Sequence, residues 1–127
     1  MKKRQIFLVF FLAGTAAIIQ GCVAAAIGAG AGAVAYVRGD LEAFEAENLN
    51  TVYKAAERTI EQLELNVIEK TKDALSVTIV TRDAENKRIR IKLKAMTENT
   101  TKISIRIGWF GEETKSRLIY DKIKVNL

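Results

Sequence analysis

Three consecutive runs of alternating apolar and polar residues occupy the middle of the chain and constrain its fold more than any other feature. Their apolar members, two residues apart, are Leu75, Val77, Ile79, Ile89, Ile91, Leu93, Ile103, Ile105 and Ile107. A period of two places successive side chains on opposite faces of a strand. Polar turns at residues 83–86 and 97–99 separate the runs. The pattern predicts an antiparallel meander with one apolar face and one solvated face.

Two segments with helical periodicity flank these runs. Apolar residues recur at steps of three and four from Leu49 to Leu63, and either Asn48 or Asn50 can cap this first helix. A second helix is expected over residues 112–124, because glutamates begin it and lysines end it, as the helix dipole favours. Its expected apolar side consists of Leu118, Ile119 and Ile123.

Shorter alternations at residues 41–45 and 65–69 predict two further strands. Both helices need an apolar surface to cover, so the predicted fold class is α+β with the order β-α-β-β-β-β-α. We expect two layers: a four- to five-stranded antiparallel sheet with two helices packed on one face. The 127 residues are 49% hydrophobic and 28% charged, which is typical of one globular domain, expected here over residues 39–127.

Residues 1–21 have the features of a secretory signal peptide. Lys2, Lys3 and Arg4 precede an uncharged, apolar stretch at residues 6–19, which is too short to span a bilayer as a helix. The following Ile19-Gln20-Gly21-Cys22 resembles the bacterial lipobox, although Gln20 stands where a smaller residue is usual. An uncleaved signal anchor is the alternative, because residues 6–37 carry no charge.

The lipobox resemblance implies that cleavage precedes Cys22 and that this cysteine carries the lipid. Several acyl chains, such as palmitate, anchor a protein stably because each buried methylene adds roughly 0.8 kcal/mol. Cys22 is the only cysteine, so the chain forms no internal disulfide. No cofactor is expected beyond this covalent lipid. Val23 follows the cysteine in place of an aspartate, and by analogy with enteric bacteria this favours the outer membrane, facing the periplasm.

Residues 22–38 are rich in glycine and alanine and are interpreted as a lipidated tether or a short membrane-apposed helix. Gly28 and Gly32 have the spacing of a close helix-packing pair. Gly28, Gly30 and Ala33 also match a dinucleotide-binding fingerprint, but no βαβ unit surrounds them. The tripeptide at residues 38–40 reads Arg-Gly-Asp and is interpreted as a turn into the first element.

Several segments together resemble a family of small bacterial lipoproteins that is known only as a domain of unknown function. The segments lie at residues 36–43, 63–65, 72–76 and 116–123 and read YVRGDLEA, LEL, KDALS and SRLIYDKI. The resemblance covers nearly the whole chain, including the Gly/Ala-rich segment. It implies an envelope lipoprotein with this α+β domain, and it assigns no catalytic residue.

The sequence contains no constellation typical of an enzyme. Histidine, the commonest general base and metal ligand, is absent, and the carboxylates are scattered. Ser116 beside Lys115, or Ser104 near Lys102, would form a serine–lysine pair only if the fold brought the side chains together. We therefore expect no metal site and a non-enzymatic binding or structural role. The alternative is an envelope-associated enzyme whose non-histidine site is not visible in the sequence.

Basic residues dominate the expected solvated face of the fourth and fifth strands. They are Arg88, Arg90, Lys92, Lys94, Lys102 and Arg106. Their alternation predicts a two-strand basic patch, which would contact anionic lipid headgroups, lipopolysaccharide phosphate or an acidic envelope protein. The alternative is an ordinary solvated face whose charges discourage aggregation.

The overall charge does not favour nucleic acid as the partner. The formal net charge is +5, and removal of Lys2, Lys3 and Arg4 with the signal would leave +2. The membrane, through the lipid anchor, is the expected partner, and the sequence leaves the oligomeric state open. Trp109 and Phe110, between two glycines, are expected to close one end of the core, with an exposed aromatic tip as the alternative.

Overall fold

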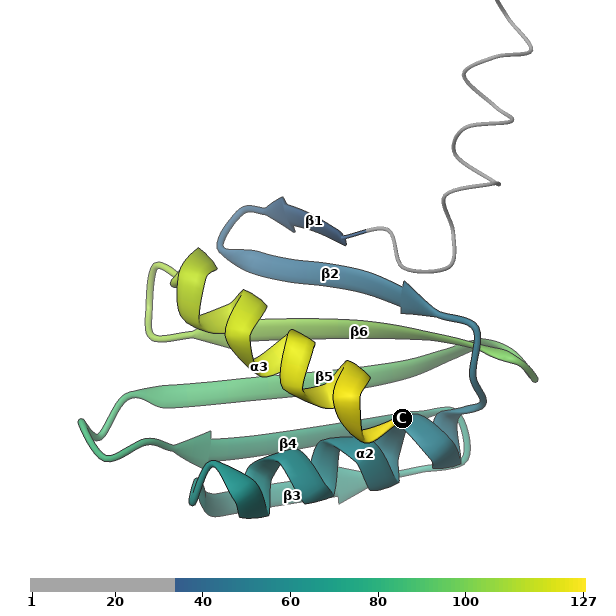
Figure 1. Cartoon of the computed structure of the whole chain (residues 1–127), viewed down its shortest axis with the longest axis horizontal. Coiled ribbons are helices and arrows are strands. Elements are labelled where there is room, and N and C mark those ends of the chain that lie inside the picture. The colour runs from purple at the N-terminus through teal and green to yellow at the C-terminus, as the bar shows by residue number, and fades with distance from the viewer. Residues whose placement is uncertain (1–33) are drawn as a thin grey trace, which may run out of the picture. The chain divides into compact units, whose positions relative to one another are not determined.

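Six antiparallel strands form one sheet in the order β1-β2-β6-β5-β4-β3, as the computed structural model of residues 34–127 shows (Figure 1). The strands are β1 (Val34–Val37), β2 (Asp40–Glu45), β3 (Asn66–Lys72), β4 (Ser76–Arg82), β5 (Arg88–Thr97) and β6 (Thr100–Ile107). The helices are α2 (Leu49–Gln62) and α3 (Glu113–Asn126). The fold class is α+β, as the alternating and helical patterns predicted.

The sheet has one strand more than the four to five expected. The additional strand, β1, lies within the segment interpreted as a tether, and it pairs Val34 with Ala43 and Val37 with Asp40. Arg38 and Gly39 form the connecting turn with φ angles of 52° and 88°, the positive values that tight hairpins require. The interpretation of Arg38-Gly39-Asp40 as a turn is therefore confirmed.

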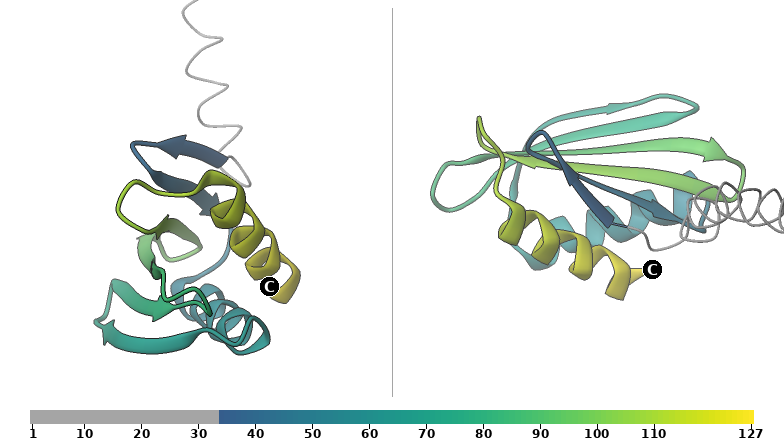
Figure 2. Two further views of the ribbon diagram at one scale, coloured as in Figure 1. Left: turned by 90° about the vertical axis from the view of Figure 1, so that its left-hand side faces the viewer. Right: turned by 90° about the horizontal axis from the view of Figure 1, so that it is seen from above.

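Both helices lie on the same side of the sheet (Figure 2). Beneath them, the alternating apolar residues of β4, β5 and β6 form one continuous core. Fully or almost fully buried members from these strands are Val77, Ile79, Ile89, Ile91, Leu93, Ile103, Ile105 and Ile107. The opposite side of the sheet carries no helix within residues 34–127, and we call it the open face.

Helix α2 begins where an asparagine side chain can accept a backbone hydrogen bond. The Oδ1 atom of Asn48 accepts from the backbone N–H of Thr51 at 2.9 Å, which identifies Asn48 and not Asn50 as the cap. Val52, Ala56 and Ile60 are buried, as their spacing predicted. Ala55 and Thr59 are buried as well, so the apolar stripe is wider than expected.

Helix α3 buries a different set of side chains from the one expected. Ile119 and Ile123 lie in the core, but Leu118 is 58% exposed, so its predicted burial is wrong. Tyr120 takes the inward position and is 1% exposed, because the helix turns the 119–120–123 edge toward the sheet. The Tyr120 hydroxyl donates a hydrogen bond to Glu45 at the end of β2. Burial and this bond raise the pKa of Tyr120 far above its usual value.

Candidate functional site: a basic strip and an aromatic tip on the open face

Apolar and basic residues alternate along β5, and this alternation places positive charge on the open face. Ile89, Ile91 and Leu93 face the helices and are at most 1% exposed. The residues between and beside them, all exposed on the open face, are Arg88, Arg90, Lys92 and Lys94. We call these four residues the basic strip. Alternate residues of an antiparallel strand repeat about every 6.8 Å, so the strip extends over roughly 20 Å.

Strand β6 places two further basic residues beside the strip. Arg106 lies opposite Arg90, and Lys102 lies opposite Lys94 in the antiparallel register. Directly opposed residues share one face of a sheet. The fold therefore brings all six basic residues named from the sequence onto the same face.

The six basic residues differ in whether an acidic partner neutralises them. The Lys102 ammonium lies 3.0 Å from a carboxylate oxygen of Glu42, and the Arg106 guanidinium lies 3.3 Å from one of Asp40. Within residues 34–127, none of the four members of the basic strip forms an ion pair or a side-chain hydrogen bond. Among these six residues, the uncompensated positive charge therefore lies on β5.

Asp40 and Glu42 are site residues that the sequence reasoning missed. Their alternation with Leu41 and Ala43 places them on the face opposite the core, which was visible in the sequence. Their position beside Lys102 and Arg106 depends on the pairing of β2 with β6. No local pattern indicates that pairing.

The aromatic pair after β6 is the clearest departure from expectation. Trp109 and Phe110 are 84% and 86% exposed, so the prediction that they close the core is wrong. The core at this end is already filled by Ile107, by its cross-strand partner Ile89, and by Ile119 of α3. Trp109 and Phe110 therefore form an exposed aromatic tip beside the basic strip.

Arg106 holds the aromatic tip in place through the backbone. Its guanidinium donates to the carbonyl oxygen of Trp109 at 2.7 Å and to that of Arg38 at 3.0 Å. This joins the β1–β2 turn to the loop that carries the tip. Arg106 makes these two hydrogen bonds and also pairs with Asp40, so its role is to position the aromatic tip.

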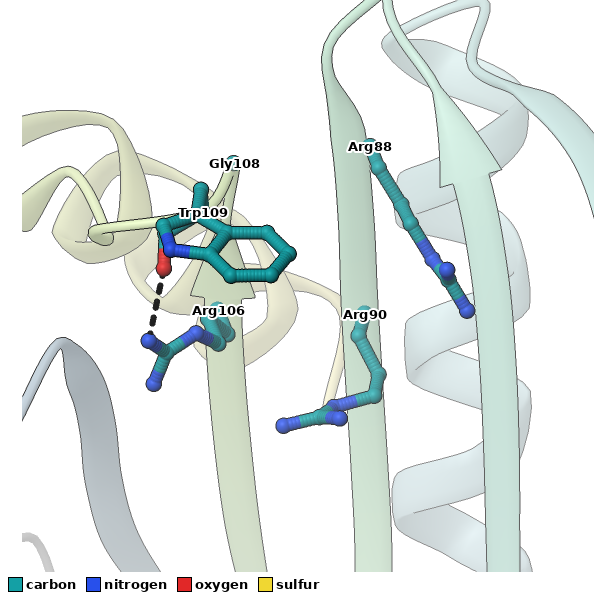
Figure 3. Close-up of a pocket in the computed structure, with 5 residues that line it drawn as sticks. All are labelled: Arg88, Arg90, Arg106, Gly108 and Trp109. Carbon is teal, nitrogen blue, oxygen red and sulfur yellow. Dashed lines mark hydrogen bonds between the residues drawn. The ribbon is translucent and has the colours of Figure 1, made fainter.

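A hollow of about 480 Å³ lies between the tip and the arginine end of the strip. Arg88, Arg90, Arg106, Gly108 and Trp109 line it (Figure 3). The Trp109 indole projects from the end of β6 toward β5, on the side of the sheet away from the helices (Figure 3). A second hollow of about 450 Å³ shares Arg90 and Arg106 with the first and continues along the open face past Lys92 and Lys94.

The serine–lysine pairs considered in the sequence do not form in the structure. The Lys115 ammonium lies 2.8 Å from a carboxylate oxygen of Asp83, whereas the Ser116 hydroxyl is buried and has no hydrogen-bond partner within residues 34–127. Lys102 pairs with Glu42, and Ser104 lies opposite Lys92. In the described part of the chain, no three His, Cys, Asp or Glu residues are grouped to hold a metal ion.

Glu57 and Asp83, two carboxylates with lowered pKa values, lie away from the open face. Hydrogen bonds from Lys70 and Tyr53 lower the pKa of Glu57, which lies on α2. The Lys115 ammonium and backbone N–H groups of the β4–β5 turn lower the pKa of Asp83. Each shift has a local ion-pair or hydrogen-bond cause, so these groups fix the turn and the helix in position.

The expected lipidation site and most of the N-terminal predictions lie outside the described residues. These include the signal peptide at residues 1–21, Cys22 itself, and the glycine pair Gly28 and Gly32. Neither α2 nor α3 has the length and apolar character that crossing a membrane requires.

Comparison with known proteins places the whole chain, and not one motif, within a family. A comparison with curated proteins finds no match. The family model described as "Protein of unknown function (DUF3568)" matches residues 5–126, which include the N-terminal segment, both helices and all six strands. The chain therefore belongs to the DUF3568 family of proteins of unknown function.

Proposed function

We propose that this chain is a lipid-anchored bacterial envelope protein that binds an anionic phospholipid surface through its open face. The proposed location is the outer membrane, facing the periplasm. The observation that carries the proposal is the basic strip, four cations without an acidic partner in the described chain, directly beside an exposed Trp–Phe pair. The role is one of binding and not of catalysis.

Charge favours a lipid surface as the occupant of the open face. Each lysine or arginine near an anionic membrane contributes about 1 kcal/mol of attraction. Asp40 and Glu42 neutralise Arg106 and Lys102 toward the β2 side, so the field is strongest over β5. The cations extend along β5 over roughly 20 Å, which suits a two-dimensional array of headgroups.

The aromatic tip favours a bilayer over an acidic protein. Tryptophan is enriched at membrane–water interfaces because its ring is apolar and its N–H is polar. Trp109 and Phe110 are more than four-fifths exposed and are held on a braced loop. An exposed aromatic pair beside free cations is the combination expected of a headgroup-level contact.

The proposed anchor and the aromatic tip would reach the same bilayer. Residues 23–33 separate Cys22 from β1, and that length of chain spans at most roughly 40 Å when extended. Strand β1 begins at the end of the hairpin that lies away from the tip, because Val34 pairs with Ala43 while the turn at Gly39 contacts Phe110. Lipid and tip would then attach the domain at two points.

The anchor is tested by the intact mass of the membrane-extracted protein beside a Cys22→Ala variant. We expect a mass that lacks residues 1–21 and includes added acyl chains, and we expect the variant to lack the lipid. An unmodified full-length mass for the parent protein would contradict the lipid anchor.

Surface binding is tested with the whole protein reconstituted into vesicles, using Trp109, the single tryptophan, as the reporter. Phosphatidylglycerol in the vesicles should shift its emission to shorter wavelength and increase its quenching by brominated lipid, and salt should reverse both effects. Lys92→Glu should reduce the response about tenfold or more. Lys54→Glu, at an exposed lysine of α2, is the matched control and should leave the response unchanged. Equal responses in neutral and anionic vesicles would overturn the proposal.

A further inference from the structure

We propose that Arg88, Arg90 and the indole of Trp109 form a subsite for a phosphate monoester group. The inference rests on the proposed function and specifies which headgroup the open face selects. The subsite is the hollow of about 480 Å³ at the end of the basic strip next to the aromatic tip. Its ligand is a terminal phosphate carried on a glycerol, sugar or lipid scaffold.

The order of the cations along β5 provides the first argument. The two arginines lie next to Trp109, and the two lysines lie farther along the strand. Guanidinium groups bind phosphate through paired, directional hydrogen bonds, whereas an ammonium acts as a strongly hydrated point charge. The arginine end of the strip is therefore suited to bind a phosphate group specifically, and the lysine end is suited to attract anions in general.

The charge of the hollow provides the second argument. Arg88 and Arg90 have no acidic partner within residues 34–127, and Arg106 is neutralised by Asp40. The Arg90 guanidinium is directed toward β6 and the hollow, whereas the Arg88 guanidinium points toward β4 (Figure 3). Arg88 is exposed and can turn its side chain toward the hollow, which then offers two uncompensated positive charges. A phosphate monoester carries a charge of about −1.5 to −2 near pH 7, whereas a phosphodiester carries about −1. The monoester is the better match.

The fixed backbone of Trp109 provides the third argument. Arg106 bonds the Trp109 carbonyl oxygen at 2.7 Å, and the loop is packed against the β1–β2 turn. The loop therefore does not need to be ordered when a ligand binds, which reduces the entropic cost of binding. The apolar face of the indole is available to the scaffold, and its N–H is available as a further hydrogen-bond donor.

The subsite predicts a pH dependence that comes from the ligand. The hollow is lined by three arginines, a glycine and a tryptophan, Asp40 is bonded to Arg106, and the chain has no histidine. Arginine does not titrate in this range. The second pKa of a phosphate monoester is about 6, so monoester affinity should fall as the pH decreases from about 7.5 to 5.5. Phosphodiester affinity should not change.

The experiment follows Trp109 fluorescence of the whole protein held in neutral vesicles. Soluble probes are glycerol 3-phosphate, inorganic phosphate and the diester glycerophosphoglycerol, and the membrane probes are vesicles with phosphatidic acid or phosphatidylglycerol at matched surface charge. We expect saturable changes with the monoesters and stronger docking on phosphatidic acid. If a soluble monoester alone changes the fluorescence, the ligand is a free phosphate compound. If only vesicles that contain phosphatidic acid change it, the ligand is a lipid headgroup.

Matched variants separate the subsite from general attraction. Arg90→Gln should weaken monoester binding about tenfold or more, the size expected for one charge-assisted hydrogen bond. Lys94→Gln removes the same charge at the far end of the strip and should change it less than twofold. Equal losses in both variants, or equal responses to monoester and diester, would overturn the subsite. Failure of the proposed function would look different: soluble monoester would still bind, but no vesicle would dock.

Discussion

Gly39 and Gly111 lie backbone against backbone, so closely that a Cβ atom on Gly111 would stand 2.2 Å from the carbonyl oxygen of Gly39. Both residues have positive φ angles, 88° and 84°. This contact joins the β1–β2 turn to the loop of the aromatic tip. The position of Trp109 beside the basic strip thus depends on two residues without side chains.

Gly111→Ala should destabilise the protein by more than about 2 kcal/mol, because it adds a backbone clash to the 1–2 kcal/mol of a left-handed conformation. Thermal unfolding measures the loss, and the emission of Trp109 reports whether the loop has moved. Gly108→Ala is the control: its φ is also positive at 67°, but no atom lies within 4 Å of the added Cβ. A similar loss in both variants would show that the close contact contributes nothing.

Asn48→Ala should cost about 1 kcal/mol of folding free energy, since it removes the side chain that accepts from Thr51. Chemical denaturation gives the difference. Asn50→Ala is the natural comparison, because the sequence allowed either asparagine as the cap. It should be neutral or slightly stabilising. The reverse ranking would mean that the helix begins elsewhere.

Asp83→Asn should reduce stability at neutral pH and have progressively less effect as the solution becomes acidic. The pKa of Asp83 is lowered in the folded protein, so its contribution is complete above the unfolded pKa of about 4 and is lost as the pH falls through the folded value. Melting temperatures of the two proteins should converge as the pH falls through the lowered pKa of Asp83. Glu85→Gln, at a carboxylate 3.7 Å from the Lys115 ammonium and 67% exposed, should show little effect at any pH.

Tyr120→Phe should cost about 1 kcal/mol near pH 7, because the hydrogen bond to Glu45 is lost. The pKa of Tyr120 is raised in the folded protein, so this contribution is complete below the unfolded pKa of about 10 and decreases as the pH rises above it. Tyrosinate absorbance during alkaline titration should show one phenol that ionises at a much higher pH than the others. This high-pH ionisation should be absent in the variant, and its persistence would assign it to another tyrosine.

The sequence predicted which side of each central strand would be buried, because alternation is a local property. Leu75 is the exception, since it precedes β4 and is 66% exposed. The alternation therefore placed all six basic residues on one face. It did not predict which strands would be neighbours. The pairing of β2 with β6 brings Asp40 to Arg106 across a separation of 66 residues. This contact, together with the bonds to the carbonyl oxygens of Trp109 and Arg38, distinguishes Arg106 from the free arginines of β5.

The errors at Trp109, Phe110 and Leu118 have a common physical origin. Apolar character suggested burial, but the core at that end of the sheet is occupied by Ile89, Ile107 and Ile119. Which apolar residues are left outside depends on how α3 is rotated, and a weakly amphipathic helix does not fix that rotation in the sequence. Strand β1 was missed for a different reason: its four residues, VAYV, directly follow the Gly/Ala-rich segment, and they form a strand by pairing with β2.

The strand order also has a consequence for how the chain folds. Strand β2 lies beside β6, so the N-terminal hairpin has no neighbour to pair with until nearly the whole sequence is present. Such non-local pairing costs loop-closure entropy before the strands gain any hydrogen bonds or packing contacts, and this slows folding. A chain that emerges from its N-terminus during synthesis would therefore keep the β1–β2 hairpin unpaired with the rest of the sheet until β6 is available.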